Sequence, residues 1–192
     1  MIFTWKEIFD IVVMTIAIAY IFKDYFPKHH HAKEYDPLDR YTKKTAAWFE
    51  DLKMPLLVAA PAIILHEFGH KFIAMAFGLD AEFNAAYTFL IIGLILKLLK
   101  FPFLIIVPAY VSYPSTALAS ETIWIALAGP LVNFVLWLAS WYILKFKKVP
   151  AKYHDALVMT KMLNGFLCVF NLIPIPGFDG SHVVSSLVDM FR

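Results

Sequence analysis

The stretch MPLLVAAPAIILHEFGHKFIAMAF, residues 54–77, is long enough and apolar enough to cross a membrane as a helix. About 20 largely apolar residues, rising about 1.5 Å each, span the hydrocarbon layer. Four ionisable residues nevertheless stand close together within it: His66, Glu67, His70 and Lys71. Such groups are costly at membrane depth unless they are paired, hydrated or bound to metal, so the cluster indicates a functional site.

The pattern His66-Glu67-Phe68-Gly69-His70, an HExxH sequence, places two imidazoles four residues apart on one face of a helix. Two such imidazoles can bind one metal ion, and a glutamate beside the first can take a proton from a metal-bound water. The alternative is an accidental match, which the apolar setting disfavours. The pattern therefore predicts a metal centre with Glu67 as its base.

A third protein ligand is expected, because catalytic zinc usually has three and leaves a fourth position for water. Six residues after His70, where a histidine would extend the motif, the chain has Ala76, so we expect a carboxylate. Asp179 is the best candidate, because two prolines and two glycines in NLIPIPGFDG, residues 171–180, break the helix and can aim its side chain inward. The alternative interpretation makes Asp179 the N-cap of a helix that runs from Ser181 onward.

The composition indicates a protein embedded in a membrane. Hydrophobic residues make up 60% of the 192 residues and charged residues 17%, which disfavours disorder and an ordinary soluble domain. The net charge of +2 argues against a nucleic-acid partner, and the single cysteine, Cys168, cannot form an internal disulfide. Four apolar segments are predicted to span the membrane: residues 8–22, 54–77, 123–144 and 156–173.

Two other segments are predicted to differ from these spans. Residues 23–53 carry charges of both signs, so we expect a polar loop with a short helix over residues 40–52. Lysines and prolines divide residues 87–114 into pieces too short to span, so we expect a helix over 87–99 and extended backbone over 104–113. Non-helical backbone at membrane depth needs protein or a water-filled cavity beside it, so this segment is predicted to be membrane-associated or re-entrant.

The expected architecture is therefore an all-α polytopic membrane protein. It forms one membrane-embedded domain over residues 1–192, with about four transmembrane helices. A membrane-associated helix and strand segment follows the HExxH helix.

Together these motifs resemble the site-2 protease family of intramembrane zinc metalloproteases. That family pairs HExxH on one membrane helix with an NPDG-type motif on a later one. A further family-like element, Gly129-Pro130 with Asn133, lies in the third apolar segment, and the resemblance covers residues 55–184. The residues that match the later motif are Asn171, Pro174, Pro176, Asp179 and Gly180.

The resemblance implies one zinc ion held by His66, His70 and Asp179, with Glu67 as the catalytic base. It also implies that Asn171 lies near the scissile carbonyl and that the strand segment 103–113 can pair with an unwound substrate. The implied reaction is hydrolysis of peptide bonds within or near transmembrane helices, by a multi-pass protein of the cell membrane. The implied partners are a transmembrane-helix substrate and the lipid bilayer, with no PDZ or CBS regulatory domain in the chain.

Two other functions stay open: a non-catalytic membrane protein that binds or transports zinc, and an inactive protease that binds membrane helices. A carrier would not need Glu67 beside His66, and the complete His, Glu, His and Asp set disfavours an inactive protease. The orientation is open as well. Eleven Lys and Arg in residues 23–53 and 145–155 place those loops in the cytoplasm, whereas the family arrangement places them outside.

Overall fold

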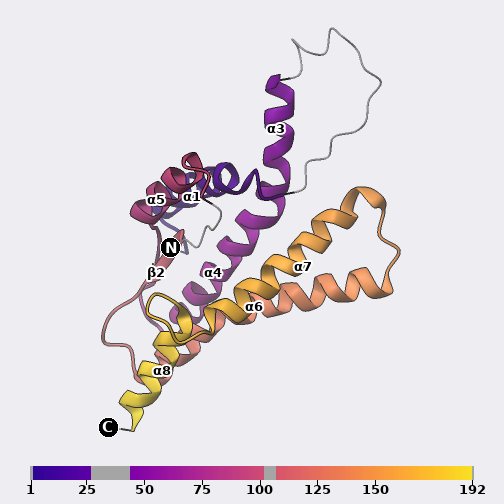
Figure 1. Cartoon of the computed structure of the whole chain (residues 1–192). Coiled ribbons are helices and arrows are strands. Elements are labelled where there is room, and N and C mark those ends of the chain that lie inside the picture. The colour runs from indigo at the N-terminus through magenta and orange to yellow at the C-terminus, as the bar shows by residue number, and fades with distance from the viewer. Residues whose placement is uncertain (1, 27–43, 102–106, 192) are drawn as a thin grey trace, which may run out of the picture.

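The computed structural model describes residues 2–26, 44–101 and 107–191. Helices dominate this part of the chain, and a small two-stranded sheet lies among them (Figure 1). The elements in chain order are α1 (Trp5–Phe22), α3 (Lys44–Met54), η1 (Pro55–Ala59), α4 (Ala60–Ala76), β1 (Glu82–Ala85), α5 (Tyr87–Leu98), β2 (Ala109–Ser112), α6 (Ala119–Phe146), α7 (Ala151–Asn171) and α8 (Asp179–Met190).

The long helix α6 is the centre of the fold. It forms a hairpin with α7 and also packs against α4 and α8 (Figure 1). Small residues allow the backbones of α4 and α6 to approach, because a Cβ on Gly69 would lie only 2.8 Å from the carbonyl oxygen of Ala128. This close packing brings the HExxH segment of α4 against the Gly129-Pro130 segment of α6.

The helix that carries the HExxH pattern begins earlier than the sequence predicts. α3, η1 and α4 follow one another without a break from Lys44 to Ala76. The short helix predicted over residues 40–52 of the polar loop is confirmed from Lys44 onward as α3, while residues 27–43 lie outside the described residues. η1 is one π-helical turn that begins at Pro55, where the missing N–H disturbs the regular α-helical hydrogen bonding.

β1 and β2 pair antiparallel, with Phe83 opposite Val111 and Ala85 opposite Ala109. The predicted extended backbone is confirmed at Ala109–Ser112, whereas residues 102–106 lie outside the described residues. The predicted helix over residues 87–99 is confirmed as α5. The sequence does not predict β1, whose four residues EFNA include no β-branched side chain, so the all-α expectation is corrected to helices with one small sheet.

The main apolar core lies where α1, η1, α4, α5 and the sheet meet. α1 starts with a capping box, in which the Thr4 hydroxyl accepts from the Glu7 N–H (3.2 Å) and the Glu7 carboxylate accepts from the Thr4 N–H (2.8 Å). α1 lies outside the segment that resembles the family, yet it belongs to the core, because it contributes Met14 and Ile18. The core residues are Met14, Ile18, Ala59, Ala60, Phe83, Ala85, Leu90 and Ala109.

Two helices in the described part of the chain are long and apolar enough to cross a membrane, Trp48–Ala76 and Ala119–Phe146. They correspond to the second and third of the four predicted spans. The predicted first and fourth spans are the helices α1 and α7, which do not pass the same test of length and composition. α1 does not count as a membrane-spanning helix by composition, because Lys6, Glu7 and Asp10 place three charged residues in its first two turns.

Candidate metal centre

His66 and His70 lie one turn apart on α4, each only 7% exposed. Nδ1 of His66 lies 2.5 Å from the side-chain oxygen of Asn133, and Nδ1 of His70 lies 2.6 Å from the carbonyl oxygen of Ile125. Both partners are acceptors, so each Nδ1 carries the proton and donates it. Each Nε2 therefore presents a lone pair to the space between the two rings, as a metal-bound imidazole does.

Asp179 reaches the same space from the other end of the described chain. The Phe178 N–H donates to the Ile175 carbonyl (3.1 Å), and Gly177 has a φ of +96°, so Pro176-Gly177 form the centre of a tight turn between α7 and α8. α8 begins at Asp179 itself. The alternative that Asp179 caps a helix starting at Ser181 is therefore wrong.

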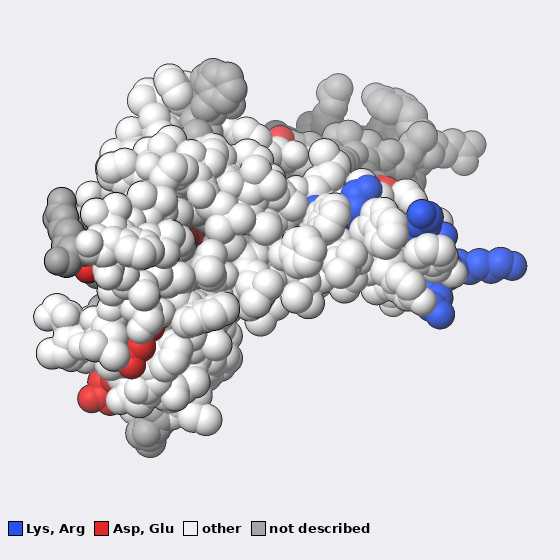
Figure 2. Space-filling model, turned by 90° about the horizontal axis from the view of Figure 1, so that it is seen from below, with Lys and Arg blue, Asp and Glu red and all other residues white. Residues whose placement is uncertain are grey.

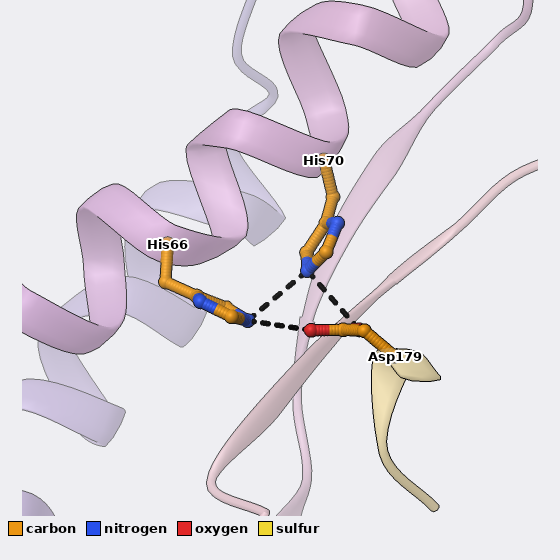
Figure 3. Close-up of side chains that lie close together, drawn as sticks. All are labelled: His66, His70 and Asp179. Atoms are coloured by element: carbon orange, nitrogen blue, oxygen red, sulfur yellow. Dashed lines mark hydrogen bonds and ion pairs between the residues drawn. The ribbon is translucent and has the colours of Figure 1, made fainter. Parts of the chain in front are cut away.

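Three ligand atoms converge (Figure 3). The two Nε2 atoms are 3.1 Å apart, Asp179 Oδ2 lies 3.1 Å from Nε2 of His66, and Asp179 Oδ1 lies 3.3 Å from Nε2 of His70. Tetrahedral zinc with ligands near 2.0–2.1 Å needs ligand separations of about 3.3 Å. Within the described residues, Asp179 Oδ2 is buried without a hydrogen-bond partner. Three acceptors at these distances, with both ring protons turned away, fit a bound cation.

The ionisation of Asp179 suits this role. Burial opposes the charged carboxylate, but positive charge beside it, on protonated imidazoles of His66 and His70 or on a cation held between the neutral rings, outweighs burial and holds the pKa of Asp179 below its usual range. Asp179 is consequently ionised at neutral pH, as a carboxylate ligand must be.

Two glycines leave the room that this geometry needs. A Cβ on Gly129 of α6 would lie 2.3 Å from Nε2 of His70 and 2.6 Å from Nε2 of His66. A Cβ on Gly180 would lie 2.3 Å from the carbonyl oxygen of Leu172, at the end of α7. Both distances are shorter than any normal contact, so only glycine fits at either position.

Asn133 links the first imidazole to a third helix. It is fully buried on α6, and its amide nitrogen donates to the Ala62 carbonyl (3.2 Å) and to the side-chain oxygen of Asn164 on α7 (2.8 Å). These donations fix the amide so that its oxygen faces His66. The sequence shows Asn164 only as a polar residue in an apolar segment, and its part in this chain appears only when the helices are packed.

Glu67 and Asn171 line the same cavity as the three converging residues. The cavity has a volume of about 460 Å³, and residues 107–113, which include β2, form one wall. Glu67 is 7% exposed, and Asn171 is half-buried at the end of α7. Phe166 and Phe170 of α7 contribute an apolar wall, and His182 of α8, to which the sequence assigns no role, also borders the cavity. The structure thus gathers the predicted site residues His66, Glu67, His70, Asn171 and Asp179 around one cavity.

Comparison with known proteins agrees with this constellation. A protein of Methanocaldococcus jannaschii that is named as a zinc metalloprotease is 30% identical to this chain over 182 residues, or 95% of this chain and 85% of that protein. The chain belongs to this zinc metalloprotease family. A second zinc metalloprotease of the same organism is 25% identical over 66% of this chain and 32% of its own length.

A relative in Synechocystis, also named as a zinc metalloprotease, is 28% identical over 73% of this chain and 32% of its own length. No protein-family model and no solved structure matches the chain. For this metalloprotease, zinc is the cation that both the relatives' names and the donor set indicate, with two imidazoles and one carboxylate.

Replacing Gly129 by alanine is expected to abolish zinc binding, because the new methyl group would occupy the space between the two Nε2 atoms. Zinc content is measured by elemental analysis of detergent-purified protein. It should fall below about a tenth of that of the unaltered protein, because the methyl group keeps the ligand atoms from reaching the ion. Ser140→Ala on the same helix is the control, since it removes only a hydroxyl that donates to the Leu136 carbonyl. Full zinc content in Gly129→Ala would contradict the assigned geometry.

Asn133→Ala is expected to weaken zinc binding without abolishing it, because His66 loses the acceptor that orients its ring. Loss of such an outer partner typically lowers metal affinity about 10- to 100-fold. Competition with a chromophoric chelator measures the change. Ser140→Ala on the same helix removes only a hydroxyl bonded to the Leu136 carbonyl and should leave the affinity unchanged. Equal affinities for the two variants would refute the orienting role of Asn133.

Proposed function

We propose that this metalloprotease is an intramembrane protease of the site-2 type, which hydrolyses peptide bonds within or near the transmembrane helices of membrane-bound substrates. One observation carries the proposal: the three convergent ligand atoms, Glu67 and a strand with a free edge all border one cavity. The proposed partners are a transmembrane-helix substrate and the lipid bilayer, and one zinc ion is the proposed cofactor.

The exterior of the helices supports a membrane setting. Only 39% of the apolar window in Trp48–Ala76 and 33% of that in Ala119–Phe146 are buried, whereas the core helix of a soluble protein is mostly buried. On the face shown in Figure 2, the basic side chains gather at one end, most of the acidic ones lie toward the other, and the broad region between them is largely uncharged. A lipid-facing belt between two charged ends has this distribution.

The chemistry proposed for the cavity divides between the chain's own residues. Zinc, when bound, supplies a Lewis acid that polarises the scissile carbonyl and makes a water more acidic. The carboxylate of Glu67 takes the proton of the attacking water and returns it to the leaving amine. The amide of Asn171 donates a hydrogen bond to the oxygen on which negative charge develops. The apolar side chains in the cavity wall lower the local polarity, which strengthens both interactions.

The sheet supports a mode of substrate binding. Alternate residues of β1 face β2, as shown by the Ala86 N–H that donates to the Pro108 carbonyl (3.0 Å). By the same alternation, Ala109 and Val111 direct their backbone groups to the other edge of β2, which carries no strand in the described part of the chain. An unwound substrate segment added at this edge would lie along the cavity wall with its carbonyls free for hydrolysis.

Glu67→Gln is expected to keep the zinc content and lose at least about 100-fold in cleavage rate, because the amide cannot accept the proton of the attacking water. The assay incubates detergent-purified protein with a tagged single-span substrate, with and without a zinc chelator. Asp179→Ala should instead lose bound zinc. A zinc carrier or an inactive protease would show no chelator-sensitive cleavage in the unaltered protein, which would refute the proposed function.

Val111→Pro is expected to raise KM about five- to tenfold at unchanged zinc content. The substitution removes an outward N–H, and one backbone hydrogen bond contributes about 1 kcal/mol. Proline is tolerated on an edge strand where the N–H does not pair within the sheet. Val111→Ala keeps the N–H and serves as the control. Identical KM values for the two variants would exclude strand addition at this edge.

A further inference from the structure

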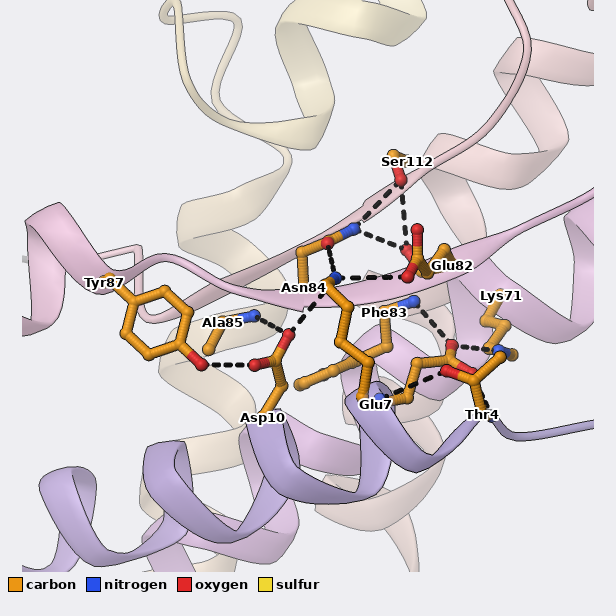
Figure 4. A network of polar contacts seen from close by, with 11 residues as sticks. Thr4, Glu7, Asp10, Lys71, Glu82, Phe83, Asn84, Ala85, Tyr87 and Ser112 are labelled. Carbon is orange, nitrogen blue, oxygen red and sulfur yellow. Dashed lines mark hydrogen bonds and ion pairs between the residues drawn. The ribbon is translucent and has the colours of Figure 1, made fainter.

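The N-terminal helix α1 carries two buried carboxylates that the proposed catalysis does not use. Glu7 is 1% exposed and Asp10 is 2% exposed, although most of α1 is apolar. A carboxylate removed from water needs partners, because its lost hydration must be replaced. The partners lie on the sheet and on the HExxH helix (Figure 4).

Glu7 joins three segments of the chain. Its Oε1 accepts a hydrogen bond from the Phe83 N–H of β1 (2.7 Å) and forms an ion pair with the ammonium group of Lys71 on α4. Its Oε2 accepts from the Thr4 N–H at the start of α1 (2.8 Å). Lys71 is 2% exposed and directly follows His70. The carboxylate of Glu7 therefore ties the sheet to the helix that bears the two imidazoles.

Asp10 binds the same strand two residues further along. Its Oδ2 accepts from the Ala85 N–H (3.3 Å), and its Oδ1 accepts from the hydroxyl of Tyr87 at the start of α5. Phe83 and Ala85 thus direct their N–H groups to the edge of β1 that faces away from β2. The two carboxylates of α1 occupy the donors that a third strand would use on that edge.

We propose that Glu7 and Asp10 are positioning residues, which close the outer edge of β1 and, through Lys71, fix the sheet relative to the helix of His66 and His70. A substrate strand then adds only at β2, and the rigid link selects the peptide bond that reaches Glu67. This inference rests on the proposed function, and it concerns where a substrate is cut.

The test compares cut sites in Glu7→Gln, Lys71→Met and the double variant. Each single variant leaves one buried group without its opposite charge, whereas the double variant carries neither charge. We expect each single variant to cut a tagged single-span substrate at additional bonds, with kcat/KM at least tenfold lower and zinc content unchanged. The double variant should regain the main cut site and most of kcat/KM. Mass spectrometry locates the cuts, and elemental analysis measures zinc.

Glu82→Gln is the matched control on the same strand. The Glu82 side chain is 46% exposed and pairs with Lys6 at the surface (3.1 Å), where an ion pair contributes little. Its cut pattern should equal that of the unaltered protein. The inference is overturned if the single variants cut at the original bond with unaltered kcat/KM, or if their activity falls only as zinc is lost and the double variant does not recover.

Hydrogen exchange of the detergent-purified chain tests the closed edge without any substrate. Asp10→Leu removes the acceptor of the Ala85 N–H, so this amide should exchange at least tenfold faster, while the Phe83 amide, still bound to Glu7, should not. Unchanged exchange at Ala85 overturns this inference alone. Absence of cleavage by the unaltered protein overturns the proposed function instead, so the two failures are distinguishable.

Discussion

Three acceptor atoms share one buried space, and the rest of the site follows from that constraint. The two Nε2 atoms and the Asp179 carboxylate lie 3.1–3.3 Å apart, while the ring protons of His66 and His70 point away to other acceptors. In a low-dielectric surrounding such an arrangement is unfavourable without a cation among its members. A bound ion would therefore hold α4 and α8 together and would couple metal binding to the packing of these helices.

The site depends as much on missing side chains as on ligands. Gly129 leaves space for both imidazoles, and Gly180 lets the chain turn tightly against the end of α7 so that Asp179 faces inward. Gly69 allows α4 to approach α6 closely enough for Asn133 to reach His66. Close helix packing through small residues is how helices associate where the surroundings are as apolar as their side chains. The glycines of the motifs thus have a steric explanation beside the chemical one for the histidines.

Away from the metal centre, buried polar side chains such as Glu7, Asp10 and Asn164 are paired with partners on other elements. Their pairing explains why a count of charged residues along the sequence disagrees with the structure. α1 fails a count of charged residues, yet its carboxylates at Glu7 and Asp10 face β1 and Lys71 rather than the exterior. A count along the sequence cannot distinguish an inward charge from an outward one. The sequence likewise does not reveal the role of Asn164, because that role depends on a hydrogen bond from Asn133 on another helix.

The sequence by itself determined the spacing of His66 and His70 on an apolar helix, the break before Asp179 and the extended backbone near β2. Each of these is local, because helical periodicity and the conformational limits of proline and glycine act over a few residues. Only the tertiary structure decided that β1 pairs with β2, that Asn133 and Asn164 stand behind His66, and that α1 closes one edge of the sheet. These contacts join residues far apart in the chain, and their partners are chosen by side-chain packing, which no local pattern encodes.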